Sequence, residues 1–206
     1  MSHDIGIIGD GCAALSLAAK AEQLPGHNIT LIRPNGAPES KDHVWGFWSD
    51  ETLEDAVSLA RGTWHQWAVI TPKKSVTMFS KSKPYNAIKR SDWTAHCQSL
   101  AQSAGVRFID QDDWSAEDNS AIFDTRPPVA PDDCILQHFH GLEIKTNTPV
   151  FEAETAILMD FRVDQSKGMH FIYLLPYSTT EALVESTIFS TELVDEQFYL
   201  STIDNY

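Results

Sequence analysis

One glutamate interrupts an apolar stretch near the end of the chain. In EALVESTIFS, residues 181–190, the alternation typical of a β-strand puts Leu183, Glu185 and Phe189 on one face. A carboxyl group in such an apolar site has a raised pKa, because burial disfavours its charged form. Glu185 could therefore hold a proton near neutral pH and act as a general acid. The alternative is a glutamate on an edge strand that points to solvent.

A glycine turn near the start of the chain indicates a second kind of chemistry. The segment GDGCAA, residues 9–14, fits the pattern GxGxxG/A between an apolar strand and a helix. Gly9 allows the tight turn, Gly11 lets the backbone approach a pyrophosphate, and Ala14 takes the last position. The N-terminus of the helix would supply N–H groups to the phosphates. This pattern favours dinucleotide binding over a plain strand–helix turn.

The next strand departs from that pattern at its end. An acidic residue normally holds the adenosine ribose there, but this strand ends in Ile32-Arg33-Pro34. Glu39 or Asp42 could replace the acid if the loop folds back. Arg33 either favours a phosphorylated ribose, as in NADP binders, or is an exposed charge at a strand end, and both interpretations stay open.

Two further pairs of residues could do chemistry. Asp160 and Arg162 lie on one strand face, where they form either an ion pair that acts on a cofactor or the acid, or a purely structural one. His138 and His140 have the same spacing, but no third ligand is evident. We therefore expect histidines on a strand face or in a loop, and no metal site.

The elements that position the glycine turn form a βαβ unit. It consists of a strand over 4–9, a helix over 12–24 and a strand over 28–33. A second helix is predicted over 91–105, with Ser91 as N-cap and Gly105 as C-cap. Two short strands follow, at 106–109 and 121–124.

The last third of the chain has a different texture. Turn-like segments separate three apolar runs, which predict an antiparallel meander near 155–163, 169–176 and 181–190. The final residues, FYLSTIDNY, predict no closing element. The predicted fold is α/β, with a Rossmann-type dinucleotide-binding region over 1–140 and an antiparallel substrate and catalytic region over 141–206.

Composition limits the setting in which this chemistry takes place. The chain has 206 residues and is 42% hydrophobic and 21% charged, which is typical of a soluble globular protein. It has no apolar run of the roughly 20 residues that cross a membrane, and the segment MSHDIGIIGDG leads us to expect no secretory signal. Three scattered cysteines, Cys12, Cys97 and Cys134, favour free thiols in the cytoplasm. The net charge of −14 excludes nucleic acid as a partner and disfavours adhesion to anionic lipid.

Eight segments together resemble one family, the flavoprotein lycopene cyclases of carotenoid biosynthesis. The most specific are FDTRPP, ILMDFRVDQ, FIYLLPYS and ALVEST, which follow one another in family order. The others are IIGDGCAALSLA, DHVWGFW, YNAIKRSDW and LQHFHGLEI. The resemblance covers essentially the whole chain, although members of the family are considerably longer. It therefore leads us to expect a truncated cyclase or a fragment of one.

The resemblance implies a reaction without net redox change. A proton is added to the terminal double bond of a ψ-end of lycopene, the resulting carbocation closes on the neighbouring alkene, and loss of a ring proton gives a β-ring, toward β-carotene. Glu185 matches the family's essential acid, and Asp160 and Arg162 join the expected catalytic set. Aromatic faces stabilise a carbocation without trapping it, and the available rings belong to Trp45, Phe47, Trp48, Phe171 and Tyr173.

The same resemblance implies the cofactors and the membrane contact. FAD is expected in its reduced form, with NADPH as its reductant. The turn residues Gly9, Gly11 and Ala14 would bind it, and Arg126 and Arg90 are further candidates for cofactor contacts. Because lycopene resides in membranes, we expect peripheral contact with a membrane through an apolar tunnel mouth.

One departure and two alternatives accompany this hypothesis. Ser186 stands where the family usually has a second acid, which is harmless only if that position faces away from the substrate. The first alternative is a redox flavoenzyme, such as an FAD-dependent monooxygenase, which would consume reduced nicotinamide and oxygen. The second is a non-catalytic truncated remnant, which would hold no flavin.

Overall fold

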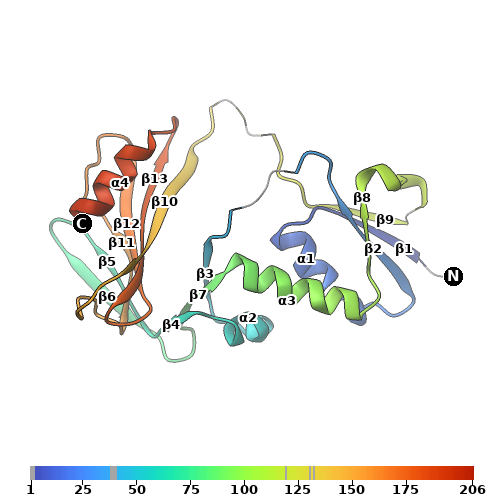
Figure 1. Ribbon diagram of the computed structural model, residues 1–206, viewed down its shortest axis with the longest axis horizontal. Coiled ribbons are helices and arrows are strands. Elements are labelled where there is room, and N and C mark those ends of the chain that lie inside the picture. Colours follow the sequence, from blue (N-terminus) through green and yellow to red (C-terminus); the bar gives the residue numbers. More distant parts are fainter. Residues whose placement is uncertain (1–2, 38–40, 119, 130, 132) are drawn as a thin grey trace. The chain divides into compact units, whose positions relative to one another are not determined.

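The protein consists of two compact units, each built from two segments of the chain (Figure 1). The computed structural model describes residues 3–37, 41–118, 120–129, 131 and 133–206. The first unit comprises Met1–Trp45 and Ile88–Val129, and the second comprises Gly46–Ala87 and Ala130–Tyr206. The boundary expected at residue 140 falls inside strand β10 (Leu136–Lys145).

The first unit contains a parallel sheet of four strands in the order β8-β2-β1-β9. Parallel strands with the glycine turn directly after the central β1 are the Rossmann-type arrangement. The α/β fold predicted from the sequence is confirmed in this unit. The strands are β1 (His3–Ile8), β2 (His27–Arg33), β8 (Arg107–Asp110) and β9 (Ala121–Asp124).

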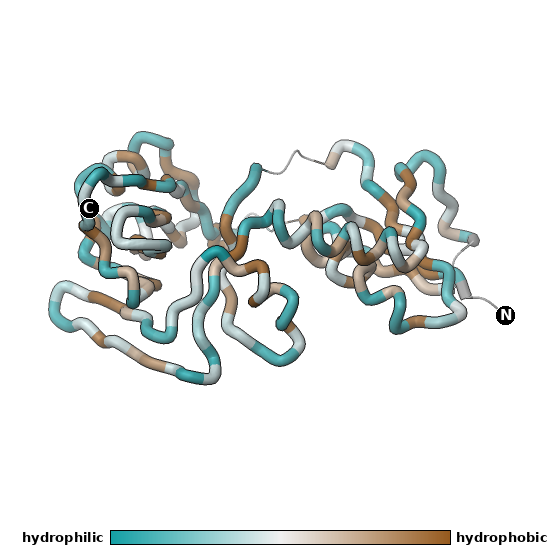
Figure 2. Tube along the Cα trace, turned by 60° about the horizontal axis from the view of Figure 1, so that its bottom comes forward, coloured by the Kyte–Doolittle hydropathy of each residue, from teal (hydrophilic) through white to brown (hydrophobic). Residues whose placement is uncertain are grey.

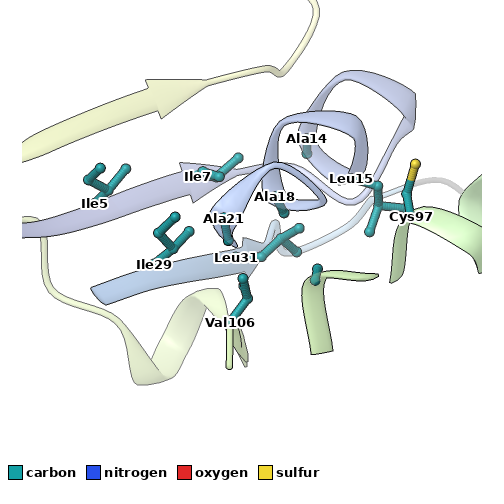
Figure 3. Packing of buried hydrophobic residues seen from close by; sticks show 11 residues of the cluster. Ile5, Ile7, Ala14, Leu15, Ala18, Ala21, Ile29, Leu31, Cys97 and Val106 are labelled. Atoms are coloured by element: carbon teal, nitrogen blue, oxygen red, sulfur yellow. The ribbon is translucent and has the colours of Figure 1, made fainter. Parts of the chain in front are cut away.

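Helices α1 (Cys12–Ala18) and α3 (Arg90–Ser103) pack against one face of this sheet. Alternate residues of β1 and β2 meet small side chains of the helices, as Figure 3 shows for Ile7, Leu31 and Ala18. Helix α1 is shorter than the predicted 12–24, because a 3₁₀ turn at Ala21–Gln23 replaces its last turns.

Helix α3 begins one residue before the predicted N-cap. Lys89 is the N-cap, and Ser91 lies inside the helix. The cap comes from another segment, since a carboxylate oxygen of Asp42 accepts a hydrogen bond from the Ser91 N–H at 3.0 Å, and its other oxygen accepts one from the Ser91 hydroxyl at 2.9 Å. At the other end, Gly105 has a φ of 80° just beyond the C-cap, a left-handed conformation that suits glycine.

The second unit contains a sheet of six strands in the order β10-β13-β12-β11-β5-β6. The predicted antiparallel meander is confirmed by β11 (Thr155–Asp160), β12 (Met169–Pro176) and β13 (Glu181–Ser190). Three strands that were not predicted extend it, and one of them, β10, pairs antiparallel with β13. Strand β5 (Gln66–Ile70) runs parallel to β11, and β6 (Ser75–Phe79) forms the edge.

Helix α4 (Glu196–Asn205) covers one face of this sheet, which we call the α4 face (Figure 1). Ile203 of the helix packs with Ile172 and Val184 of the sheet. The expectation of no element in FYLSTIDNY is wrong. The helix is capped by Asp195, whose carboxylate accepts a hydrogen bond from the Phe198 N–H at 2.9 Å.

A small sheet contains three strands in the order β3-β7-β4. These strands are β3 (Val44–Trp48), β7 (Tyr85–Lys89) and β4 (Gly62–Trp64), and the short helix α2 (Glu54–Ser58) lies between β3 and β4 in sequence. Across the described part of the chain, every helix is too short or too polar to traverse a bilayer.

Candidate functional site

The glycine turn of the first unit has the geometry of a dinucleotide-binding turn. Gly9 has a φ of 137°, and a Cβ there would lie 2.1 Å from Oγ1 of Thr125. Gly11 is the N-cap of α1, and a Cβ there would meet nothing within 4 Å. Gly9 is therefore required by the fold itself, whereas the space above Gly11 is open to a ligand. Ala14 is fully buried behind the turn.

The segment FDTRPP supports this turn from the neighbouring strand. The Thr125 hydroxyl, the group that leaves no room for a side chain at Gly9, donates a hydrogen bond to the carbonyl of Ile8 at 2.8 Å. Arg126 follows directly and pairs with Asp124, with an Nε to Oδ1 distance of 2.9 Å. This pairing lowers the pKa of Asp124 to about 2. Arg126 thus lies at the carboxyl edge of the parallel strands, beside the glycine turn.

Arg33 and Arg90 line one cavity of about 570 Å³ with Asp10, the residue between the two glycines. Arg33 and Asp10 form an ion pair, with 3.4 Å between Nε and Oδ2. The end of β2 therefore brings a cation to the position where an acid normally meets the ribose. Asp110, the partner of Arg33 on β8, supplies a carboxylate to the same cavity.

Of the two acids considered as replacements for the missing ribose ligand, Asp42 does not line this cavity. Asp42 is committed to the start of α3, where its hydrogen bond from the Ser91 N–H lowers its pKa. Glu39 lies outside the described residues.

In the second unit, Glu185 lies on the face of the six-stranded sheet opposite to α4, which we call the Glu185 face. Residues directly opposite one another on paired strands share a face, and Glu185 is opposite Tyr173 of β12 and Gly141 of β10. Its side chain is half-buried and accepts a hydrogen bond from the Thr187 hydroxyl at 3.1 Å. Burial raises the pKa of Glu185 to about 7, and the Thr187 hydrogen bond opposes only part of that effect.

A glycine makes room for this carboxyl group. A Cβ on Gly141 would lie 3.3 Å from Oε2 of Glu185 and 3.2 Å from Leu183. A glycine inside a strand often marks such a close approach. The segment LQHFHGLEI contains that signal, although Gly141 was not among the predicted site residues.

The negative charge of Glu185 affects the pKa values of three tyrosines. Its charge contributes to the raised pKa values of Tyr85, Tyr173 and Tyr177, for which burial is the larger cause. The pKa of Tyr177 rises to about 12. Its hydroxyl group is buried and has no hydrogen-bond partner among the described residues. Of these three tyrosines, only Tyr173 was among the aromatic residues predicted from the sequence.

Tryptophans complete the aromatic surroundings. The ring of Trp64 lies between those of Tyr85 and Tyr177, with centroids 6.4 and 6.2 Å away, and its Nε1 donates a hydrogen bond to the Pro176 carbonyl at 3.0 Å. Trp48 lies 4.9 Å from Tyr85. The predicted aromatic candidates Trp48 and Tyr173 therefore belong to this cluster, together with Phe171, which lies 5.2 Å from Tyr173.

Asp160 and Arg162 form the predicted ion pair, but on the other side of the sheet. Asp160 is fully buried, is paired with Ile172, and accepts a hydrogen bond from the Tyr206 hydroxyl at 2.9 Å on the α4 face. Burial raises the pKa of Asp160, but hydrogen bonds from Arg162 and Tyr206 outweigh it and leave the value lowered. The sheet thus separates this pair from Glu185, and the geometry is that of an ion pair that holds the end of α4.

Ser186, the departure from the family pattern, also belongs to the α4 face. It is fully buried, and its hydroxyl lies 2.8 Å from Nε2 of His170. Nδ1 of His170 lies 2.7 Å from the Asp164 carbonyl and must donate to it, so Nε2 accepts the serine proton. Burial lowers the pKa of His170, which favours its neutral form. The position of the second acid therefore faces away from Glu185.

The two histidines considered as metal ligands lie on the α4 face of β10. His138 makes hydrogen bonds with Tyr199 and, at 2.8 Å, with Ser190. His140 stacks on Tyr199 and lies 3.6 Å from a carboxylate oxygen of Glu196. The contacts with Tyr199 and Glu196 join β10 to α4.

A comparison with models of protein families shows to which family the chain belongs. Residues 4–206 match the family described as lycopene cyclase protein. The chain belongs to the lycopene cyclase family. A lycopene beta-cyclase of Paracoccus sp. (strain N81106 / MBIC 01143) is 27% identical over 213 residues, which cover 92% of this chain and 52% of that relative. This lycopene cyclase family member therefore spans about half the length of the curated relative that it matches.

Solved structures share the fold of this family member at low sequence identity. A geranylgeranyl bacteriochlorophyll reductase-like protein of Thermoplasma acidophilum is similar with a TM-score of 0.65 and 12% identity, over 99% of this chain and 61% of that one. A flavin-dependent halogenase of Xanthomonas campestris, Xcc4156, is similar with a TM-score of 0.61 and 10% identity, over 100% of this chain and 59% of that one. These similarities support a Rossmann-type fold with an antiparallel sheet.

Proposed function

We propose that this lycopene cyclase family member takes part in the acid-catalysed cyclisation of lycopene ψ-ends to β-rings, with Glu185 as the proton donor. The observation that carries the proposal is the half-buried Glu185 carboxyl, with a pKa raised to about 7, on a sheet face rich in aromatic rings. A carboxylic acid with such a pKa is protonated in a substantial fraction of molecules at neutral pH. The apolar surroundings that raise the pKa also suit a hydrocarbon substrate.

The proposed chemistry conserves electrons. The O–H bond of Glu185 breaks as its proton adds to the terminal carbon–carbon double bond, which leaves a tertiary carbocation and a carboxylate. The neighbouring double bond closes on the cation to form the ring, and a ring carbon then loses a proton to give the new double bond. The aromatic faces of Tyr173, Tyr85 and Trp48 stabilise the cation and offer it no strong nucleophile.

The residues of the glycine turn fit FAD. Gly11 leaves space for a pyrophosphate above the start of α1, and Arg126 and Arg90 lie at the same edge of the parallel sheet as Gly9. When bound, reduced FAD would supply an electron-rich ring system suited to a reaction that develops positive charge, and NADPH is its proposed reductant. The flavin-dependent halogenase of the same fold makes flavin binding reasonable here.

The test of this proposal is pigment formation in cells that accumulate lycopene. Expression of the chain should convert lycopene to products with β-rings, and Glu185→Gln should abolish the conversion. Glu181→Gln is the matched control, because Glu181 lies on the same strand but is bonded to Lys145 at the surface. Equal conversion by the parent and Glu185→Gln would refute the acid role.

Two measurements separate the alternatives. A redox flavoenzyme would consume NADPH and oxygen in proportion to product, whereas the cyclase requires no such consumption. A non-catalytic remnant would purify without flavin absorbance and would leave lycopene unchanged.

A further inference from the structure

The hairpin of β5 and β6 has a charge that contrasts with the rest of the chain. The whole chain has a net charge of −14, yet it contains no Asp or Glu between Asp55 and Asp92. Four lysines of that interval, all exposed, lie on or beside the hairpin at Lys73, Lys74, Lys81 and Lys83. Among the described residues, only Lys83 of the four has an ion-pair partner, Asp50 at 3.6 Å. The positive charge is therefore concentrated at one edge of the second unit.

The same hairpin exposes apolar side chains to solvent. Every residue of β6 is exposed, including Val76, Met78 and Phe79 with exposed fractions of 42%, 37% and 66%. Figure 2 shows hydrophilic residues at the tip of this hairpin, at the left of the view, and hydrophobic residues farther along it. The turn is fixed, because the N–H and the carbonyl of Lys74 both bond to the Thr71 side chain at 3.0 Å. Apolar side chains next to lysines are the combination that anionic lipid bilayers attract.

This edge is continuous with the Glu185 face. Met78 is opposite Trp67 on β5, and Trp67 is opposite Ala156 on β11. The next residue, Ala68, is paired with Ile157, and Ile157 is paired with Leu174. Leu174 packs against the core cluster that includes Ile203 of α4, so these residues lie on the α4 face. Trp67 and Met78 must therefore lie on the opposite, Glu185 face.

Ring contacts carry this path onward to the acid. Trp67 lies 4.5 Å from Trp48, and Trp48 lies 4.9 Å from Tyr85. Tyr85 is close enough to Glu185 for the carboxylate charge to affect it. A stripe of apolar and aromatic side chains thus runs from the exposed hairpin edge to the surroundings of Glu185.

We propose that the β5–β6 hairpin is the element with which the protein docks on an anionic phospholipid bilayer. The edge strand enters the headgroup region with Met78 and Val76 on its Glu185 face and Phe79 on its opposite face. The four lysines contact lipid phosphates. The aromatic stripe from Met78 to Tyr85 is then the route by which a membrane-dissolved polyene reaches the acid. This last step rests on the proposed function, whereas the docking itself does not.

The experiment is co-sedimentation of the protein with lipid vesicles in the absence of any polyene. Vesicles of phosphatidylcholine with phosphatidylglycerol should bind the protein, and pure phosphatidylcholine should bind it much less. Raised salt should weaken the binding, because it screens the lysines. The double variant Lys73→Ala/Lys74→Ala should lower the partition coefficient about 25-fold, since one lysine near an anionic surface is worth about fivefold, or about 1 kcal/mol. Phe79→Ser should lower it as well.

Matched controls come from the same unit. Leu193 is 70% exposed, and Lys167 is exposed in a different turn, so Leu193→Ser and Lys167→Ala should leave vesicle binding unchanged. Unchanged denaturant unfolding of each variant verifies that it is folded. The proposal is overturned if the parent protein stays in the supernatant or if the hairpin variants bind vesicles as the parent does. It is also overturned if the hairpin edge is a dimer contact, so that Phe79→Ser dissociates a dimer without affecting lipid binding. The vesicle assay contains no polyene, so its result does not depend on cyclase activity. A failure of the protein to convert lycopene would therefore not contradict the proposed docking.

Discussion

Replacement of Glu185 by glutamine should stabilise the protein at alkaline pH and leave it nearly unaffected at acidic pH. The folded protein holds the Glu185 pKa at about 7 because of burial, whereas the ordinary value is 4.5. Below about pH 4 the Glu185 carboxyl is largely protonated in both the folded and the unfolded protein. Its burial therefore does not lower the free energy of unfolding there. As the pH rises from 4.5 to 7, the unfolded chain loses the proton first, and the free energy of unfolding falls.

The magnitude follows from the two pKa values. Their difference corresponds to up to about 3 kcal/mol of lost stability at pH 8. Glutamine has nearly the same shape but no charge to bury, so Glu185→Gln should recover most of that free energy at pH 8 and almost none at pH 4. Denaturant unfolding of both proteins at the two pH values measures the difference.

A neighbouring variant gives the opposite sign. The hydrogen bond from Lys145 lowers the pKa of Glu181, so its ionised form favours folding above the ordinary pKa, and that contribution is lost as the pH falls. Glu181→Gln should therefore give no gain at pH 8. If Glu185→Gln has the same effect on stability at both pH values, the carboxyl is not held in its protonated form and the reasoning is wrong.

Three further variants test the frame around the two sites. Gly9→Ala should destabilise the first unit by about 2 kcal/mol or more, because φ at this position is 137° and the new Cβ would lie 2.1 Å from Oγ1 of Thr125. The control Gly26→Ala has open space around its Cβ and should lower the free energy of unfolding clearly less in the same experiment. Asp42→Ala should cost about 1 kcal/mol through loss of the α3 cap, with partial recovery in Asp42→Asn. Asp160→Asn should cost about 2 kcal/mol, because it weakens the charged hydrogen bonds of a fully buried carboxylate with the exposed Arg162. The pH dependence of the Glu185→Gln effect should persist in that background, and its disappearance would place Asp160 in the surroundings of the acid.

The sequence predicts those parts of the fold whose signals are local. The glycine turn, the βαβ unit and the three-stranded meander depend on alternation and turn residues within short segments, and all are found. Helix α4 was missed because FYLSTIDNY has no strong apolar periodicity, although Asp195 and Glu196 before it form an N-terminal signal. The exposed β6 has no buried face at all, so its place in the sheet depends only on its partner strand.

The candidate site shows the same limit. Alternation places Glu185 and Asp160 on strand faces, but only the register between strands decides that these faces are opposite. Tyr85 lies 100 residues before Glu185 in the sequence, so no local pattern could bring the two together. Tyr177 lies in the turn between β12 and β13, and the burial of its hydroxyl group becomes evident only in the folded structure. Ser186 is explained in the same way, because its burial beside His170 becomes evident only when α4 is in place.

The central claim is that the Glu185 carboxyl delivers a proton to an alkene without net redox change. The most direct measurement is conversion of lycopene in deuterated water under reducing conditions, followed by mass analysis of the product and of NADPH. The account predicts one solvent-derived deuterium for each β-ring formed, no NADPH consumed in proportion to product, and no conversion by Glu185→Gln. Rings without deuterium, or NADPH consumed in proportion to product, would contradict it.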